Sequence, residues 1–406
     1  MDVSPDKVSL EVQLPITELE LAFGQNLSKA PEQVLADYSP QLREYLLAHI
    51  HAYTTPEKPW LINVTALHLS KGNYVESNIP YWELVAIVEM RPQSGENTRD
   101  FYLDYDAIMH QVINHSALAN VRNDWENGKV ENYSILSQAI SWDLASNKIA
   151  PFHVVLGKGS NWQGFKSLVV MGMRHIYEGT DHLMFLLVLL LPSTQLFRNN
   201  KWEGFKGTRK SLISLLKITS AFTIGHSITL LLAALNWVRV PAQPIEILIA
   251  ISILISAIHA MKPVFAGKEV YIAAGFGLIH GLAFAATLVN LNLDATRMIM
   301  SILAFNVGIE FMQLFIISII IPWLLLWSTT ISYRFLRLFG ATIAIIAATG
   351  WIIQRISYSH NFVTDIMDKT VDYTWYLIAG LAVLSVVNYI IFKKVVKRKT
   401  VSANQY

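Results

Sequence analysis

Long apolar stretches recur through the second part of this chain and limit what it can fold into. Seven of them are long enough to cross a bilayer, which needs about 20 mostly apolar residues. They cover residues 165–191, 212–235, 245–261, 271–291, 298–327, 335–353 and 375–392. The chain is 53% hydrophobic and 15% charged, where about 25% charged is usual for soluble domains. The sequence therefore predicts an α-helical polytopic membrane bundle of about seven helices.

The part of the chain before these stretches has a different character. Residues 1–160 contain 11 Lys and Arg against 20 Asp and Glu, whereas residues 161–406 contain 21 against 10. No apolar run before residue 160 is long enough to span a bilayer. We therefore expect a separate domain over residues 1–160, a transmembrane domain over residues 161–399 and a short tail over residues 400–406.

The first domain has the periodicity of a β-rich fold. Apolar and polar residues alternate from Val8 to Leu14, from Trp82 to Met90 and from Phe101 onward, as half-buried strands do. A helical run opens at Pro31. We expect a small sandwich-like α+β domain with an inserted helix. Its six histidines show no ligand spacing and are interpreted as surface or structural residues: His49, His51, His68, His110, His115 and His153.

Basic residues in the connections predict the orientation, because Lys and Arg accumulate on the cytoplasmic side. Fourteen fall on one set of connections and the tail, and four on the alternate set: Arg239, Arg297, Arg355 and Lys369. The C-terminal tail is then cytoplasmic and the 160-residue domain lies outside. Because the sequence begins without a basic, apolar leader, we expect that an export signal peptide has been removed.

Ionisable residues inside the apolar stretches are the candidates for function, because they are costly in a membrane. Counting along the helices places them at a similar depth on four spans. They are His175, Glu178, Asp181, His182, His226, His280, Asn306 and Glu310. Any single histidine could merely bond a neighbouring carbonyl, and Asn306 could join two helices. Together they predict a divalent-metal site, since imidazole and carboxylate suit nickel, cobalt, zinc or iron(II). The chain has no cysteine, which excludes thiolate ligands.

Four motifs in order resemble the HupE/UreJ family of membrane proteins, in its longer branch with an extracytoplasmic N-terminal domain. Residues 175–182 carry the pattern His-x5-Asp-His. The others lie at residues 221–227, 276–284 and 306–310. The resemblance implies an integral protein of a bacterial inner or plasma membrane. It also implies nickel or cobalt transport, with the ion in transit bound by His175, Asp181 and His182.

The resemblance is incomplete at a second motif, which the permeases of this family carry as Phe-His-Gly-x-x-His-Gly-x-Glu. Aligned on His280, its first histidine falls on Phe276 and its glutamate on Ala283. His226 and Glu310 could replace those ligands.

Three functions fit these observations. The first is a metal permease whose midplane site is formed by His175, Asp181, His182, His226 and His280. Glu178, Glu310 and Asn306 would supply further ligands or charge balance in that site. The second is an intramembrane zinc-dependent hydrolase with Glu310 as general base. The third is a non-catalytic scaffold whose outer domain binds a protein partner. The expected partners are the lipid bilayer and a divalent ion, with no nucleic acid.

Overall fold

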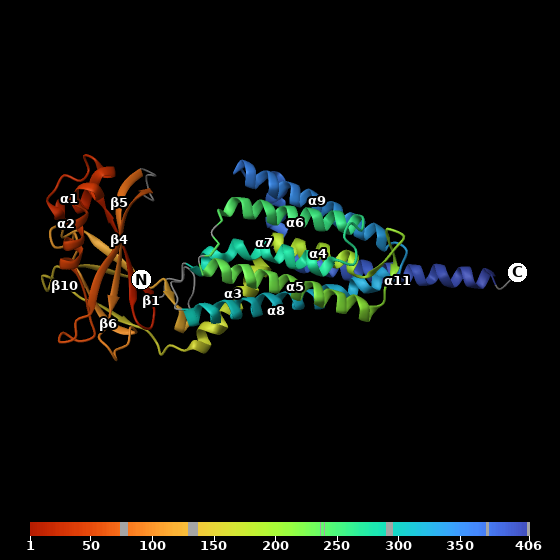
Figure 1. Ribbon diagram of the computed structural model, residues 1–406, viewed down its shortest axis with the longest axis horizontal. Coiled ribbons are helices and arrows are strands. Elements are labelled where there is room, and N and C mark those ends of the chain that lie inside the picture. The colour runs from red at the N-terminus through yellow and green to blue at the C-terminus, as the bar shows by residue number, and fades with distance from the viewer. Residues whose placement is uncertain are drawn as a thin grey trace. The chain divides into compact units, whose positions relative to one another are not determined.

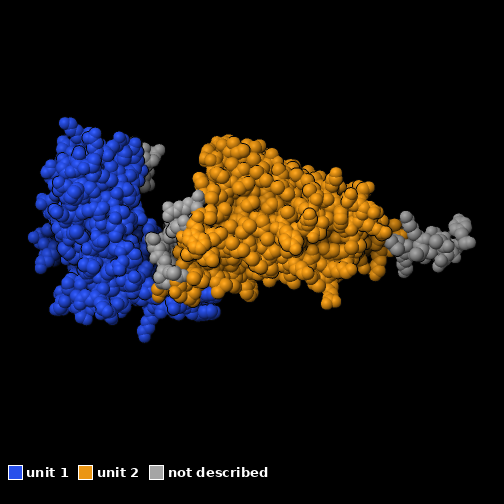
Figure 2. All heavy atoms as spheres, viewed as in Figure 1, with its two compact units in different colours: residues 1–167 blue, residues 168–406 orange. Residues whose placement is uncertain are grey.

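The computed structural model describes residues 1–73, 80–128, 137–235, 237–238, 240–289, 295–370 and 373–403. The chain divides into two compact units, Met1–Ser167 and Leu168–Tyr406, which Figure 2 shows in separate colours. The division falls close to the domain boundary expected at residue 160.

A five-stranded sheet is the largest part of the first unit, and its strand order is β4-β5-β2-β1-β8. These strands are β1 (Asp2–Val3), β2 (Val8–Pro15), β4 (Leu61–Asn73), β5 (Pro80–Arg91) and β8 (Asn123–Asp124). β2 and β5 contain two of the three predicted strands, and they pair antiparallel. Alternate side chains of β2 are buried, as the sequence period predicts.

Two three-stranded sheets complete the first unit (Figure 1). One joins β11 (Phe152–Val155), β6 (Asp100–Tyr105) and β3 (Ile50–Tyr53), and the other joins β10 (Lys148–Ile149), β9 (Ser137–Asp143) and β7 (Ser116–Asn120). The predicted helix is α2 (Val34–His49), preceded by a 3₁₀ turn, Pro31–Gln33. Helix α1 (Ile16–Phe23) and a 3₁₀ turn at Trp125–Asn127 were not predicted.

One apolar core unites this unit. It contains Leu14 of β2, Leu42 of α2, Val88 of β5, Phe101 of β6 and Val154 of β11, all fully buried. Sheets and helix α2 thus bury their apolar faces against one another, as the predicted sandwich-like α+β domain requires.

Helices make up most of the second unit (Figure 1). They are α3 (Asn161–Glu178), α4 (Thr180–Ser193), α5 (Thr208–Ala234), α6 (Ala242–Met261), α7 (Glu269–Val289), α8 (Ala295–Ser328), α9 (Tyr333–Ser357), α10 (Phe362–Thr370) and α11 (Thr374–Ala403). Within the described residues, α5, α6, α8, α9 and α11 are long and apolar enough to cross a membrane, and α4 and α7 are shorter apolar helices. Together they account for the predicted bundle of about seven spans.

Two features of this unit correct the sequence analysis. The first predicted span, 165–191, is not one helix, because the chain leaves helical geometry at Gly179, between α3 and α4. The connection after α4, expected to be a basic loop, forms a hairpin of β12 (Gln195–Arg198) and β13 (Lys201–Phe205). Its turn residues Asn199 and Asn200 both have positive φ, the geometry of a tight two-residue hairpin.

Candidate metal centre

Four imidazole rings gather inside the second unit, contributed by α3, α4, α5 and α7. Ring centroids are 4.6 Å apart for His175 and His182, and 5.0 Å for His182 and His280. His226 lies 6.3 Å from His175. These distances link the rings in the order His226, His175, His182, His280, and we call the four residues the membrane histidine row. His182, His226 and His280 are buried and His175 is half-buried.

The break at Gly179 places two of these rings beside each other. His175 lies in the last turn of α3 and His182 in the first turn of α4. A Cβ at Gly179 would lie 2.8 Å from the His175 carbonyl oxygen and 2.8 Å from Nδ1 of His182. Only glycine fits this point of the chain. A locally opened helix at a polar membrane site is tolerated where the backbone is enclosed by protein.

Glycines also bring the other two histidines together. Helices α5 and α7 run side by side (Figure 1), and a Cβ at Gly277 or Gly281 would collide with the backbone carbonyl of Phe222 or His226. Such small residues let two helix backbones approach closely. Consequently His226 on α5 and His280 on α7 both reach the same row.

An asparagine fixes the orientation of the His226 ring. Asn306 on α8 donates its side-chain amide to the Ile302 carbonyl (2.7 Å), so its Oδ1 faces Nδ1 of His226 at 3.2 Å. Because Oδ1 can only accept, the proton of a neutral His226 lies on Nδ1. Its Nε2 then carries a free lone pair.

A serine does the same for His280. Ser252 on α6 donates its hydroxyl to the Ile249 carbonyl (2.7 Å), and the same oxygen lies 3.0 Å from Nε2 of His280. Since the hydroxyl has one proton, His280 donates this second hydrogen bond. The lone pair of a neutral His280 is therefore on Nδ1.

A carboxylate orients His182. Oδ1 of Asp181 accepts from Nδ1 of His182 (2.9 Å) and from its backbone N–H (2.8 Å). The guanidinium of Arg355 lies 3.8 Å from Oδ2 of Asp181 and balances its negative charge. The same guanidinium lies 3.5 Å from Oε2 of Glu246. Asp181 thus occupies the position of an outer partner that orients a metal-binding imidazole.

The nitrogens left free by these contacts meet no partner. Among the described residues, Nε2 of His175, His182 and His226 and Nδ1 of His280 are buried without a hydrogen bond. A buried polar atom without a partner costs roughly 1–3 kcal/mol, so four together need an explanation. A divalent ion that prefers imidazole nitrogen would satisfy the free nitrogens of the neighbouring rings that it contacts. The donor set therefore fits a metal.

The remaining sequence-predicted residues lie elsewhere. Glu178 pairs with Arg174 at 3.5 Å and its side chain is 65% exposed, so it does not face the row. Glu310 accepts hydrogen bonds from Ser220 (2.9 Å) and Thr223 (2.6 Å) on α5. Neither carboxylate has a described contact with a histidine of the row.

Several contributors to this environment were not found from the sequence. Ser252 is a common residue in an apolar helix, and Arg355 was counted as a loop cation although it lies in α9. Aromatic rings also enclose the row: Phe284 lies 4.8 Å and Phe305 5.4 Å from His175. The only sequence sign of these residues was their apolar context, which does not distinguish a site wall from ordinary packing.

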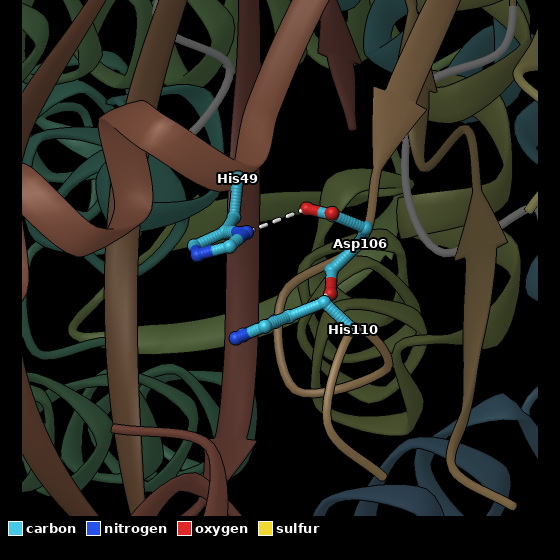
Figure 3. A group of neighbouring side chains, drawn as sticks. All are labelled: His49, Asp106 and His110. Carbon is cyan, nitrogen blue, oxygen red and sulfur yellow. Dashed lines mark hydrogen bonds and ion pairs between the residues drawn. The ribbon is translucent and has the colours of Figure 1, made fainter. Parts of the chain in front are cut away.

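The ligand atoms of the membrane histidine row are too widely spaced to form a compact group of three. Within the described residues, the group of three whose ligand atoms all lie within 4.8 Å of one another is His49, Asp106 and His110 of the first unit (Figure 3). The interpretation of the six histidines as surface or structural residues rested on their spacing in the sequence, which does not reveal this arrangement. The fold brings together residues that are far apart in the sequence.

Fold and site together define a polytopic integral membrane protein whose helices enclose a row of histidines. A family model described as HupE / UreJ protein matches residues 153–355, and the chain belongs to this family. The match includes the four membrane histidines and ends at Arg355. Neither a curated protein nor a solved structure gives a match.

Proposed function

We propose that this protein is a permease for a divalent transition-metal ion of the nickel or cobalt type. The observation that supports it most is the set of four buried histidine nitrogens that have no partner among the described residues. Three of those rings have outer partners that leave the unpartnered nitrogen as the lone-pair donor. Such outer partners are typical of metal-binding histidines.

The spacing of the row favours labile binding, which a transported ion requires, over permanent binding. The ring centroid of His175 lies 6.3 Å from that of His226 and 4.6 Å from that of His182. The centroids of His182 and His280 are 5.0 Å apart. An ion bound between one pair can exchange to the next by replacing one imidazole at a time. A closed four-coordinate cage would hold the ion and slow its release.

The charge balance of the site supports a cation as the cargo. Asp181 lies beside His182, and its charge is shared with Arg355, which also pairs with Glu246. The carboxylate therefore lowers the cost of a cation near His182 without being its ligand. We further propose that the basic connections face the cytoplasm and that the first unit lies outside, as the Lys and Arg bias indicates.

Metal uptake into vesicles tests the function. Proteoliposomes containing wild type, His182→Ala or His280→Ala are given Ni²⁺, and His360→Ala is the control because its side chain is 75% exposed. We expect both row variants to fall to the rate of empty vesicles and the control to match wild type. Unchanged uptake in both row variants would contradict the proposal.

An intramembrane hydrolase is the second candidate, because outer partners of this kind also occur around resident catalytic zinc. A hydrolase needs a general base beside the metal-bound water. Glu310, the sequence candidate for that base, instead accepts hydrogen bonds from Ser220 and Thr223. Zinc that copurifies at one equivalent and survives dialysis would favour the hydrolase. A dialysable ion would favour the permease.

A further inference from the structure

The first unit contains a second group of potential ligands, His49, Asp106 and His110, which the proposed function does not use (Figure 3). We call it the outer group, because the proposed orientation places the first unit outside. His49 is the last residue of α2 and precedes β3, while Asp106 follows β6. Ile50 pairs with Tyr105 in the antiparallel ladder, and the Asp106 N–H continues it by donating to the His49 carbonyl (3.2 Å). The strand register therefore fixes His49 and Asp106 beside each other.

His110 reaches the same point through a constrained turn. Its N–H donates to the Asp106 carbonyl (3.0 Å), one helical turn back. Within this turn Ile108 has φ of 65°, which is unfavourable for a β-branched residue. The buried side chain of Ile108 and a hydrogen bond from its N–H to the Tyr45 hydroxyl (2.8 Å) hold it there. Strain maintained in this way is frequent at functional sites.

Asp106 orients both rings. Its Oδ1 lies 2.7 Å from Nδ1 of His49, and its carbonyl oxygen lies 3.2 Å from Nδ1 of His110. Both oxygens accept, so the two neutral rings carry their protons on Nδ1 and their lone pairs on Nε2. The rings are stacked, with centroids 4.0 Å apart. Figure 3 shows the outer nitrogens of both rings on the same side, away from Asp106.

The surrounding surface is suited to a cation. Buried and exposed residues alternate along β3, β6 and β11, so one face of this sheet belongs to the core and the other is polar. The polar face also carries His51, cross-strand partner of Asp104, and His153, which lies 2.8 Å from Asp100. Residues 1–160 as a whole contain 20 Asp and Glu against 11 Lys and Arg. Such an excess raises the local concentration of cations.

We propose that His49 and His110 bind a divalent transition-metal ion through their Nε2 atoms, with Asp106 holding both rings in place. No hydrogen bond from a described residue reaches either Nε2 atom. Metal–imidazole bonds of about 2.0–2.1 Å span roughly 4 Å across one ion, so the two stacked rings must tilt until their in-plane lone pairs converge on it. Imidazole donors select nickel, cobalt, copper or zinc over calcium and magnesium. This site does not depend on the membrane histidine row or on transport.

Calorimetric titration with Co²⁺ tests the proposal on the full-length protein in detergent. The variants are His49→Gln, His110→Gln and Asp106→Asn, and His68→Gln is the control because it is an exposed histidine on β4 of the same unit. We expect each histidine variant to lose one Co²⁺ equivalent relative to wild type. Asp106→Asn should keep that equivalent with an affinity about 10–100-fold lower. The control should bind as wild type does.

The outcomes separate this proposal from the proposed function. Wild-type stoichiometry and affinity in both His49→Gln and His110→Gln would overturn the outer site, whatever the transport assay shows. Thermal unfolding and circular dichroism identify a variant that fails to fold. In that case the Co²⁺ titration of the other histidine variant decides whether the site binds metal. Loss of the equivalent in His110→Gln together with unchanged Ni²⁺ uptake into vesicles would confirm a metal site separate from the transport path.

Discussion

Both units gather histidines, but they do so by different physical means. In the first unit an antiparallel register and one strained turn bring His49, Asp106 and His110 within 4.8 Å on a half-exposed surface. In the second unit, glycine contacts and a broken helix bring His175, His182, His226 and His280 into a buried row. The first arrangement is compact and depends on one carboxylate. The second is extended and has an outer partner for each of three rings.

The difference shows what each environment requires. At a polar surface, water can solvate an unused imidazole nitrogen, so an outer histidine cluster costs little when it is empty. In a membrane interior an unpartnered nitrogen has no such alternative. The membrane histidine row is therefore the stronger indication of a ligand, although the outer group is the more compact.

The largest effect is expected from closing the space between α5 and α7. Gly277→Ala would place a Cβ against the Phe222 carbonyl and force apart the helices that carry His226 and His280. We expect a loss of about 1–3 kcal/mol in stability and loss of Ni²⁺ uptake. Gly275→Ala is the matched control, because its Cβ would meet nothing within 4 Å. Thermal unfolding in detergent and uptake in vesicles measure both, and equal behaviour of the two variants would contradict the close packing.

Removing an outer partner from the row should have a smaller effect. Ser252→Ala takes away the acceptor that orients His280, so we expect about 10-fold weaker Ni²⁺ binding with little change in unfolding temperature. Ser256→Ala is the control, since its hydroxyl donates to the Ser252 carbonyl one turn away. If equilibrium dialysis gives the same affinity for both, His280 does not depend on Ser252 for its orientation.

For the outer group, Tyr45→Phe tests the strained turn. The change removes the acceptor of the Ile108 N–H and should lower the stability of the first unit by roughly 1 kcal/mol. Burial raises the pKa of Tyr45 to about 12, so the effect should not vary between neutral and mildly alkaline pH. Tyr38→Phe is the comparison, because its hydroxyl bonds no described residue. Chemical denaturation that gives equal losses for the two variants would argue against the role of this bond.

The smallest effect concerns an ordinary surface ion pair in the same unit. Lys7 lies 2.6 Å from Glu89, and this hydrogen bond lowers the pKa of the carboxyl group. The stabilisation is therefore present above the unfolded pKa of about 4.3 and is lost as pH falls through the lower folded value.

The matching variant is Lys7→Met. It should lower stability by less than about 1 kcal/mol at neutral pH, and the difference from wild type should shrink between about pH 6 and about pH 3. Lys29→Met is the control, since Lys29 has no ion pair with a described residue. A difference that grows on acidification would have the wrong sign for this pair.

Hydropathy predicted the membrane bundle, because the length and apolar character of a span follow from local sequence. It did not predict the break at Gly179, since one extended residue does not disturb a long apolar run. Ser252 also left no pattern, because its role depends on α6 packing beside α7. Of the basic residues counted for topology, Arg239 lies outside the described residues.

The outer group could not be predicted for a related reason. His49 and Asp106 are 57 residues apart, and only the pairing of β3 with β6 makes them neighbours. A search for local ligand spacing finds sites built within one element, whereas this one is built across three. The expected sandwich-like domain was confirmed, but its strand register was not determined by the sequence pattern.

X-ray absorption at the nickel edge tests the central claim most directly, using full-length His110→Gln protein so that the outer group does not contribute. We expect imidazole nitrogen ligands at about 2.0–2.1 Å, with the imidazole scattering reduced when His182→Ala or His280→Ala is added. A first shell of oxygen alone, or a spectrum unchanged by both added substitutions, would contradict the binding of the ion by the membrane histidine row.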